Sequence, residues 1–269
     1  TALGSQALQA NTTASNNTAV GYAAGLSVTT GVQNVLIGSI AGDALTDSDF
    51  NVAIGYQALS ADTLGNSSIA IGYNALRSQN FTSATNSQNT VIGHNAGQAI
   101  STGEANVLIG QTAAADQTTG GYNVALGTAT LRLNTVASQN VAIGHHALYH
   151  LEPSSATNTL NVAVGYHAGK AVTTGIQNTL IGGNAGDALT DSDYNTVVGY
   201  EALSSDTLGG RSTAIGYQAL ATQNFTSATN VYNTAVGYSA GIAVTTGVNN
   251  TLIGGLSGDA ITTGANNTA

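Results

Sequence analysis

Six aspartates occur in two copies of one motif, and their spacing is the first pattern in the chain that could do chemistry. The motif is GDALTDSDF at residues 42–50 and GDALTDSDY at residues 186–194. Ca²⁺ prefers several hard oxygen ligands at close range, so calcium is one hypothesis. The alternative is structural, because Asp-Ser-Asp stands where other repeats have Thr-Gly, and Asp suits turns for conformational reasons. The candidate calcium ligands are Asp43, Asp47, Asp49, Asp187, Asp191 and Asp193.

Histidine is concentrated in one short region, at positions 145, 146, 150 and 167. If neighbouring repeats stack in register, His146 and His167 are about 5 Å apart. Histidine pairs can bind zinc or nickel. The chain has no cysteine, however, and no carboxylate recurs beside the histidines. We therefore expect no transition metal here and interpret His145 as the replacement of a repeated tyrosine.

No pattern in the sequence indicates a catalytic site. Serine and histidine never recur with a carboxylate at a position special to one repeat, which a hydrolytic triad would need. A periodic scaffold also offers ridges more readily than a deep pocket. We expect no enzymatic activity and no cofactor other than the calcium considered above.

Composition excludes further classes of protein. Only 6% of the residues are charged, the net charge is −9 and four residues are basic. So few cations cannot neutralise a phosphate backbone, and nucleic acid is not an expected partner. No segment approaches the roughly 18 to 20 uninterrupted apolar residues of a membrane span, so we expect no membrane segment within this stretch.

A five-residue phrase, such as NTAVG at 17–21 or NVLIG at 34–38, recurs along the whole chain and ends each time in glycine. A 17-residue step leads from Gly21 to Gly38 and again to Gly55, whereas a 21-residue step leads from Gly72 to Gly93. Fixed periods near 20 are typical of solenoids. We predict an all-β chain, a parallel β-solenoid (β-roll) of about 15 coils with one 21-residue coil in every 72 residues. Residues 1–269 would form a single continuous segment, with super-repeats near 21–92, 93–164, 165–236 and, partially, 237–269. The chain starts and stops inside a phrase, so we also expect it to be part of a longer fibre.

The phrase itself predicts a short strand with two apolar faces. Aliphatic residues precede the glycine, as at Ile37, Ile54 and Ile71, and β-branched residues stand two positions earlier. Residues two apart share one face of a strand. The residue between them is also apolar, so both faces need cover. A narrow solenoid has one interior, and we expect sister copies of the chain to cover the other face.

Two corners of each coil are recognisable. The phrase begins with Asn in most repeats, for example Asn17, Asn34 and Asn51, and stacked amides can hydrogen-bond from coil to coil. We predict an asparagine ladder. The sequence TTG, as at 29–31, marks another corner, where we expect the glycine to supply a positive φ.

The three long coils carry their additional residues in RSQNFTSATNSQ (77–88), YHLEPSSATNTL (149–160) and ATQNFTSATNVY (221–232). Four additional residues must bulge outward, and functional residues concentrate on such loops. The alternative is that the loop packs on a neighbouring chain. The candidate ligand-binding residues are Phe81, Thr82, Tyr149, His150, Phe225 and Thr226, with both phenylalanines as candidate exposed contacts. A tyrosine also follows many of the phrase glycines. These rings could form a row that stacks on sugars; we prefer the alternative, that they pack within the protein.

The phrases NTAVG, NVAIG and STAIG resemble the head repeats of trimeric autotransporter adhesins, and more closely the NTAIGYxAL…TTG arrays of bacterial and phage tail-fibre-like proteins. The resemblance covers essentially the whole chain. It implies a left-handed parallel β-roll of three chains about one axis. The 17- and 21-residue coils depart from the adhesin family, whose coils are more often shorter.

These observations favour a non-enzymatic segment of an extracellular fibre or adhesin on a cell surface or virion. Its repetitive surface would attach to a host or substrate through many weak contacts with glycan or matrix. The alternatives are a phage tail-fibre shaft or a purely structural filament. An ice-binding solenoid, suggested by the threonine rows, ranks last because TTG is missing from most third and fourth coils.

Overall fold

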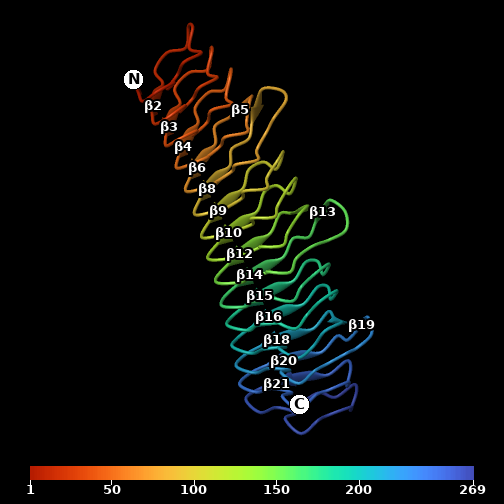
Figure 1. Ribbon diagram of the computed structural model, residues 1–269. Helices are drawn as coiled ribbons and strands as arrows, with labels where there is room; N and C mark the ends of the chain where they lie inside the picture. The colour runs from red at the N-terminus through yellow and green to blue at the C-terminus, as the bar shows by residue number, and fades with distance from the viewer. The chain divides into compact units, whose positions relative to one another are not determined.

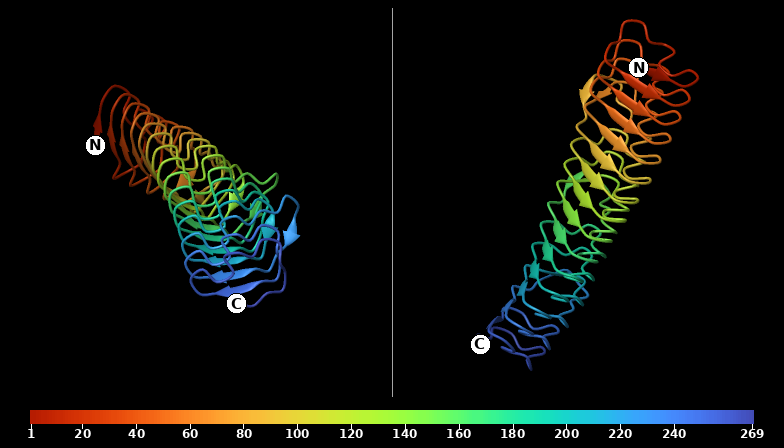
Figure 2. Two further views of the ribbon diagram at one scale, coloured as in Figure 1. Left: turned by 90° about the horizontal axis from the view of Figure 1, so that it is seen from below. Right: turned by 90° about the vertical axis from the view of Figure 1, so that its left-hand side faces the viewer.

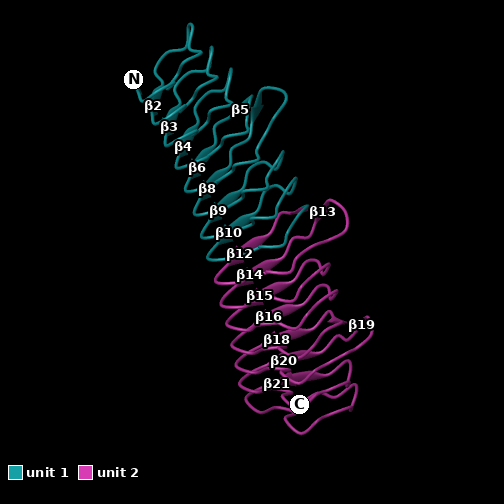
Figure 3. Ribbon diagram, viewed as in Figure 1, with its two compact units in different colours: residues 1–136 teal, residues 137–269 magenta.

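The computed structural model describes all residues 1–269 and contains β-strands and turns without any helix (Figure 1). Consequently no helix of the length and apolarity needed to cross a membrane is present. The chain divides into two compact units, Thr1–Val136 and Ala137–Ala269 (Figure 3).

Unit 1 consists of one parallel main sheet and one small two-stranded sheet. The main sheet has the order β1-β2-β3-β4-β6-β8-β9-β10, and β5 pairs with β7. The strands are β1 (Ala2–Leu3), β2 (Thr18–Val20), β3 (Val35–Ile37), β4 (Val52–Ile54), β5 (Gly65–Asn66), β6 (Ile69–Ile71), β7 (Thr85–Asn86), β8 (Thr90–Ile92), β9 (Val107–Ile109) and β10 (Val124–Leu126).

Unit 2 repeats this plan. Its main sheet has the order β12-β14-β15-β16-β18-β20-β21, and two small sheets pair β11 with β13 and β17 with β19. The strands are β11 (Ala137–Ser138), β12 (Val141–Ile143), β13 (Thr157–Asn158), β14 (Val162–Val164), β15 (Thr179–Ile181), β16 (Thr196–Val198), β17 (Gly209–Gly210), β18 (Thr213–Ile215), β19 (Thr229–Asn230), β20 (Thr234–Val236) and β21 (Thr251–Ile253).

The register of the main sheets confirms the sequence period. Val35 pairs with Val52 across one short coil, whereas Ile69 pairs with Thr90 and Ile143 with Val164, each across one long coil. Within each unit, every coil adds one strand in parallel to the strand before it, and these strands line one face of the solenoid (Figure 2). The chain is therefore a parallel β-solenoid of about 15 coils.

The middle residue of each strand points into the solenoid. Ala19, Leu36 and Ala53 are completely buried, while the residues on either side are partly or largely exposed. Leucine is accommodated where the neighbouring coils have glycine: a Cβ added at Gly25 would lie 2.6 Å from a Leu36 methyl group, and one at Gly42 would lie 2.8 Å from the other. The core is thus filled by compensating large and small residues, and the outward face keeps its β-branched side chains.

The asparagine ladder is confirmed and lies inside the solenoid. Oδ1 of Asn17 accepts the backbone N–H of Asn34 at 2.8 Å, and Oδ1 of Asn34 accepts that of Asn51 at 2.9 Å. The Asn34 amide also donates to the carbonyl of Ser48 at 2.7 Å, across the coil. These residues are at most 4% exposed. Each asparagine therefore supplies the partner that a buried backbone N–H of the next coil requires.

The expectation about the TTG glycine was wrong. At this corner the positive φ belongs to a non-glycine residue two positions later, +59° at Gln33, and the φ of Gly31 does not lie in that region. Gly31 is required for another reason, since an added Cβ would lie 2.3 Å from the carbonyl oxygen of Ser48. Close approach of consecutive coils, and not backbone conformation, excludes a side chain there.

Candidate functional site

Each long coil extends an exposed loop beyond its neighbours, near β5, β13 and β19 (Figure 1). The loop returns by pairing a Thr-Asn dipeptide with the preceding coil, as in Gly65 with Thr85 or Gly209 with Thr229. Thr82 and Thr226 at the tips of these loops are exposed, as is His150, while Tyr149 is half-buried. These four predicted site residues are therefore accessible from solvent.

Phe81 and Phe225, in contrast, are not the exposed aromatic contacts that we expected. They are only 5% and 8% exposed. The backbone N–H of Phe225 donates to Oδ1 of Asp206 at 3.0 Å, and the Thr207 hydroxyl donates to the Phe225 carbonyl at 2.8 Å. The phenylalanine therefore anchors the base of the loop, and its ring is not available to a ligand.

The anchor depends on a buried aspartate. Oδ1 of Asp206 also accepts the N–H of Gly209 at 3.0 Å, and Oδ2 accepts the Gln223 amide at 2.6 Å. The Gln223 carbonyl in turn accepts the amide of the ladder residue Asn233 at 2.8 Å. Burial raises the pKa of Asp206, an effect that its hydrogen bonds oppose. The loop is thereby connected to the core ladder by a continuous polar network.

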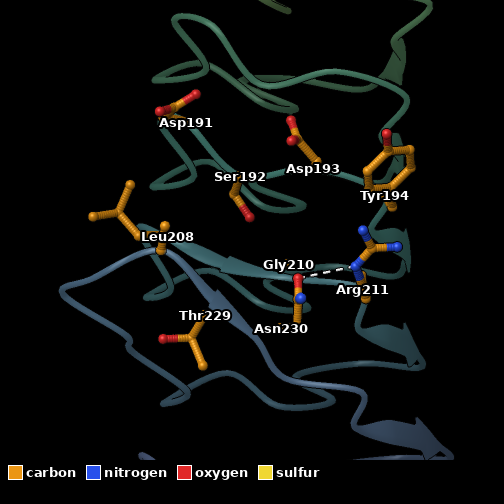
Figure 4. Close-up of a pocket in the computed structure, with 10 residues that line it drawn as sticks. Asp191, Ser192, Asp193, Tyr194, Leu208, Gly210, Arg211, Thr229 and Asn230 are labelled. Carbon is orange, nitrogen blue, oxygen red and sulfur yellow. Dashed lines mark hydrogen bonds between the residues drawn. The ribbon is translucent and has the colours of Figure 1, made fainter.

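The loop of residues 221–232 lines one side of a pocket of about 300 Å³ in unit 2 (Figure 4). Arg211 is its only cation. Its guanidinium lies over the Tyr194 ring at 4.6 Å, and its Nε donates to Oδ1 of Asn230 at 2.9 Å. The remaining polar side chains of the lining are those of Asp191, Ser192, Asp193 and Thr229. Charged, amide and aromatic groups thus converge on a space open to solvent, a combination suited to a polar ligand.

The six aspartates considered for calcium do not form converging groups. Oδ1 of Asp47 accepts the Thr30 hydroxyl at 2.6 Å, and Oδ1 of Asp49 accepts the N–H of Val32 at 2.7 Å. Asp191 and Asp193 make the same contacts with Thr174 and Ile176. Asp43 and Asp187 each leave a buried Oδ1 without a partner, and burial raises the pKa of both carboxyl groups. Four of the six carboxylates therefore bond to the preceding coil, as the turn interpretation anticipates.

A column of exposed aromatic rings follows the phrase glycines. Within unit 2 the rings of Tyr200, Tyr217 and Tyr238 stack with centroids 5.8 and 5.2 Å apart. In unit 1, Tyr56, Tyr73 and His94 stack at 5.3 and 5.1 Å. The tyrosines of these stacks are 42–60% exposed, so they pack on one another at the surface and not in the core. The position-by-position tyrosine repeat was the signal for this column.

Three histidines come together at β12 and β14 in unit 2, although the sequence suggested only two neighbours. Candidate ligand nitrogens of His145, His146 and His167 all lie within 4.8 Å of one another. Desolvation, followed by the charge of His145, lowers the pKa of His146, and desolvation followed by Lys170 lowers the pKa of His167. Both imidazoles therefore favour the neutral form.

No family model matches this sequence, and no curated protein and no solved structure matches it either. Function is therefore inferred from the loop pocket, the aromatic column and the histidine cluster.

Proposed function

We propose that this chain is a non-enzymatic segment of an extracellular fibre or adhesin, on a cell surface or virion, that attaches to glycan or matrix through a repeated surface. The observation that carries the proposal is the column of exposed, stacked aromatic rings. A solenoid in register repeats any exposed side chain once per coil, so weak contacts multiply along one chain.

The stacking defines what this column offers to a ligand. A ring between two others, such as Tyr217, presents its edge and hydroxyl, and it is 42% exposed. Tyr238, at the end of its stack, is 60% exposed. Tyr200 borders Gly183, where a Cβ would lie 3.3 Å from the tyrosine ring, so no side chain covers that face. The ring edges and hydroxyls along the column can hydrogen-bond with a ligand, while the rings at the ends of a stack can pack on the face of a sugar.

The loop pocket supplies a second kind of contact. Arg211, Asp193 and Asn230 present charged and amide groups beside Tyr194. Planar polar groups next to an aromatic ring match the hydroxyl-rich and apolar faces of a sugar. The Ser192 hydroxyl in this pocket donates to the carbonyl of Gly209 and is not poised as a nucleophile.

The test compares binding to immobilised glycans and collagen before and after replacing Tyr200, Tyr217 and Tyr238 by Ser, the residue found at the same position in Ser39. The matched control replaces the exposed Phe50 and Tyr122, which lie outside the column and the pocket, by Gln, the residue at the equivalent Gln33 and Gln177. We expect the first set to reduce attachment at least about tenfold through lost multivalency. Equal binding by the wild-type and column variants would contradict the proposal.

A purely structural filament, including a tail-fibre shaft, is the second candidate, and the outward face of the main sheets favours it. Ile37, Ile109 and Ile181 are 37–38% exposed in columns of aliphatic neighbours. We propose that sister copies cover this face in a left-handed homotrimer, as the resemblance implies. Sedimentation equilibrium tests this: a trimer is expected, and replacing the three isoleucines by Thr should dissociate it. A monomeric wild-type chain would contradict it.

A further inference from the structure

The tyrosine stacks proposed for attachment do not include the histidines that follow β12 and β14, although His145 lies at the column position and stacks on Tyr166 at 5.5 Å. We propose that His145, His146 and His167 form a binding site for a divalent transition-metal ion of the zinc, nickel and copper class.

The backbone places the three rings together. His146 and His167 occupy the same position of consecutive coils and both adopt a left-handed backbone with φ of 58°. The N–H of His167 donates to the carbonyl of His145 at 3.0 Å, which holds the two coils in register. The rings of His146 and His167 lie 5.4 Å apart and nearly parallel, and the His145 ring lies 3.8 Å from that of His146. The site is therefore built by stacking and not by a flexible loop.

An unsatisfied atom indicates that the cluster lacks a partner. Nδ1 of His146 is buried and has no hydrogen bond. The corresponding residues of unit 1 bond to each other: Asn74 donates its amide to Oδ1 of Asn95 at 3.1 Å, although Oδ1 of Asn74 also remains buried without a partner. Imidazole nitrogens without such a partner are available to a metal, which accepts their lone pairs.

The distances between the histidine nitrogens are close enough that side-chain rotation alone could bring them to one metal ion. Two nitrogens on one tetrahedral zinc ion are about 3.4 Å apart, whereas the most distant pair here lies within 4.8 Å. His145 is exposed, and His146 and His167 are half-exposed, so their rings can rotate toward a common ion. Three protein ligands leave one position for water or for a group from a partner molecule.

The surrounding charges affect the expected affinity of the site for a metal ion. Lys170 and His150 act on the cluster as like charges and oppose a cation, whereas no carboxylate belongs to the group. Lys170→Gln, which copies the equivalent Gln98, should therefore tighten metal binding a fewfold.

The experiment titrates the untagged chain with ZnCl₂ at pH 7.5 by isothermal calorimetry. We expect one ion per chain with a low micromolar or tighter Kd. His145→Tyr, His146→Asn and His167→Asn restore the residues present at Tyr73, Asn74 and Asn95, so folding should persist and circular dichroism will verify it. Each should weaken binding at least about tenfold, as loss of a ligand demands.

A histidine outside the cluster provides the control. His94→Tyr should leave the Zn²⁺ affinity within about twofold of wild type. Electron paramagnetic resonance of the Cu²⁺-loaded chain should show three coupled nitrogens. Absence of 1:1 binding, or full affinity after any one of the three substitutions, would overturn the proposal.

Discussion

Removing one rung of the asparagine ladder should destabilise the surrounding coils strongly. Asn178 is completely buried and makes contacts in both directions along unit 2. Its Nδ2 donates to the Ser192 carbonyl at 2.7 Å, and its Oδ1 accepts the backbone N–H of Asn195 at 3.0 Å. Asn178→Ala deletes both bonds and leaves the N–H of Asn195, a residue only 1% exposed, without its acceptor.

The magnitude follows from these groups. An orphaned buried donor costs about 1–3 kcal/mol, and the lost amide bond adds about 1 kcal/mol. We therefore expect Asn178→Ala to lower the free energy of unfolding by about 2–4 kcal/mol. The matched control is Gln177→Asn at the preceding exposed residue, whose left-handed φ of 55° asparagine tolerates. Its expected change is within about 0.5 kcal/mol.

Urea denaturation followed by circular dichroism gives the overall effect, and hydrogen exchange locates it. Protection should fall at the Asn195 amide and in the neighbouring coils 161–199. If Asn178→Ala is as stable as Gln177→Asn and the Asn195 amide remains protected, the ladder does not stabilise the stack as described.

Three further substitutions test other parts of the structure. Gly182→Ala should cost at least about 3 kcal/mol, because φ is +135° and the new Cβ would lie 2.4 Å from the carbonyl oxygen of Gly199. The adjacent Gly183→Ala, which meets only the Tyr200 ring, should be tolerated in thermal melts, and equal losses for both would contradict this reasoning. Phe225→Ala should cost about 3–5 kcal/mol and release the loop to proteolysis, whereas Thr226→Ala at the exposed tip should change little; an intact loop in Phe225→Ala would show that the ring is no anchor. Asp187→Ser, which copies the equivalent Ser204, should raise stability at pH 7 by up to about 1 kcal/mol, because it removes a half-buried carboxylate with an unpartnered oxygen. Burial raises the pKa of Asp187 above its ordinary value near 3.8, so its protonation stabilises the fold at low pH, and that contribution disappears as pH rises through the folded-state pKa. The advantage of Asp187→Ser in denaturant midpoints should therefore shrink toward pH 4, and a constant difference would contradict the assignment.

The features that repeat in every coil could be predicted from the sequence. The 17- and 21-residue register and the asparagine ladder follow from period and residue type, because a periodic chain has one way to stack identical corners. The inward-facing side of the strand could not be predicted, because Val35, Leu36 and Ile37 are all apolar. In the structure the choice is set by side-chain volume, because the buried Leu36 fills the space left by Gly25 and Gly42 in the adjacent coils.

Features that depend on loop conformation were harder to predict. The burial of Phe225 follows from an aspartate in the preceding coil, and a signal was present in the paired recurrence of Asp62 with Phe81 and of Asp206 with Phe225. The third histidine of the cluster was missed for a similar reason. The left-handed backbone at His146 brings its ring to within 3.8 Å of its sequence neighbour, which strand alternation does not suggest.

The central claim, attachment through a repeated aromatic column, is tested most directly by dissociation rates from surfaces carrying a bound glycan at graded density. We expect the wild-type chain to dissociate much more slowly as density increases, and the Tyr200, Tyr217 and Tyr238 to Ser variant to lose most of that dependence. Dissociation that is independent of density, or identical for both chains, would contradict it.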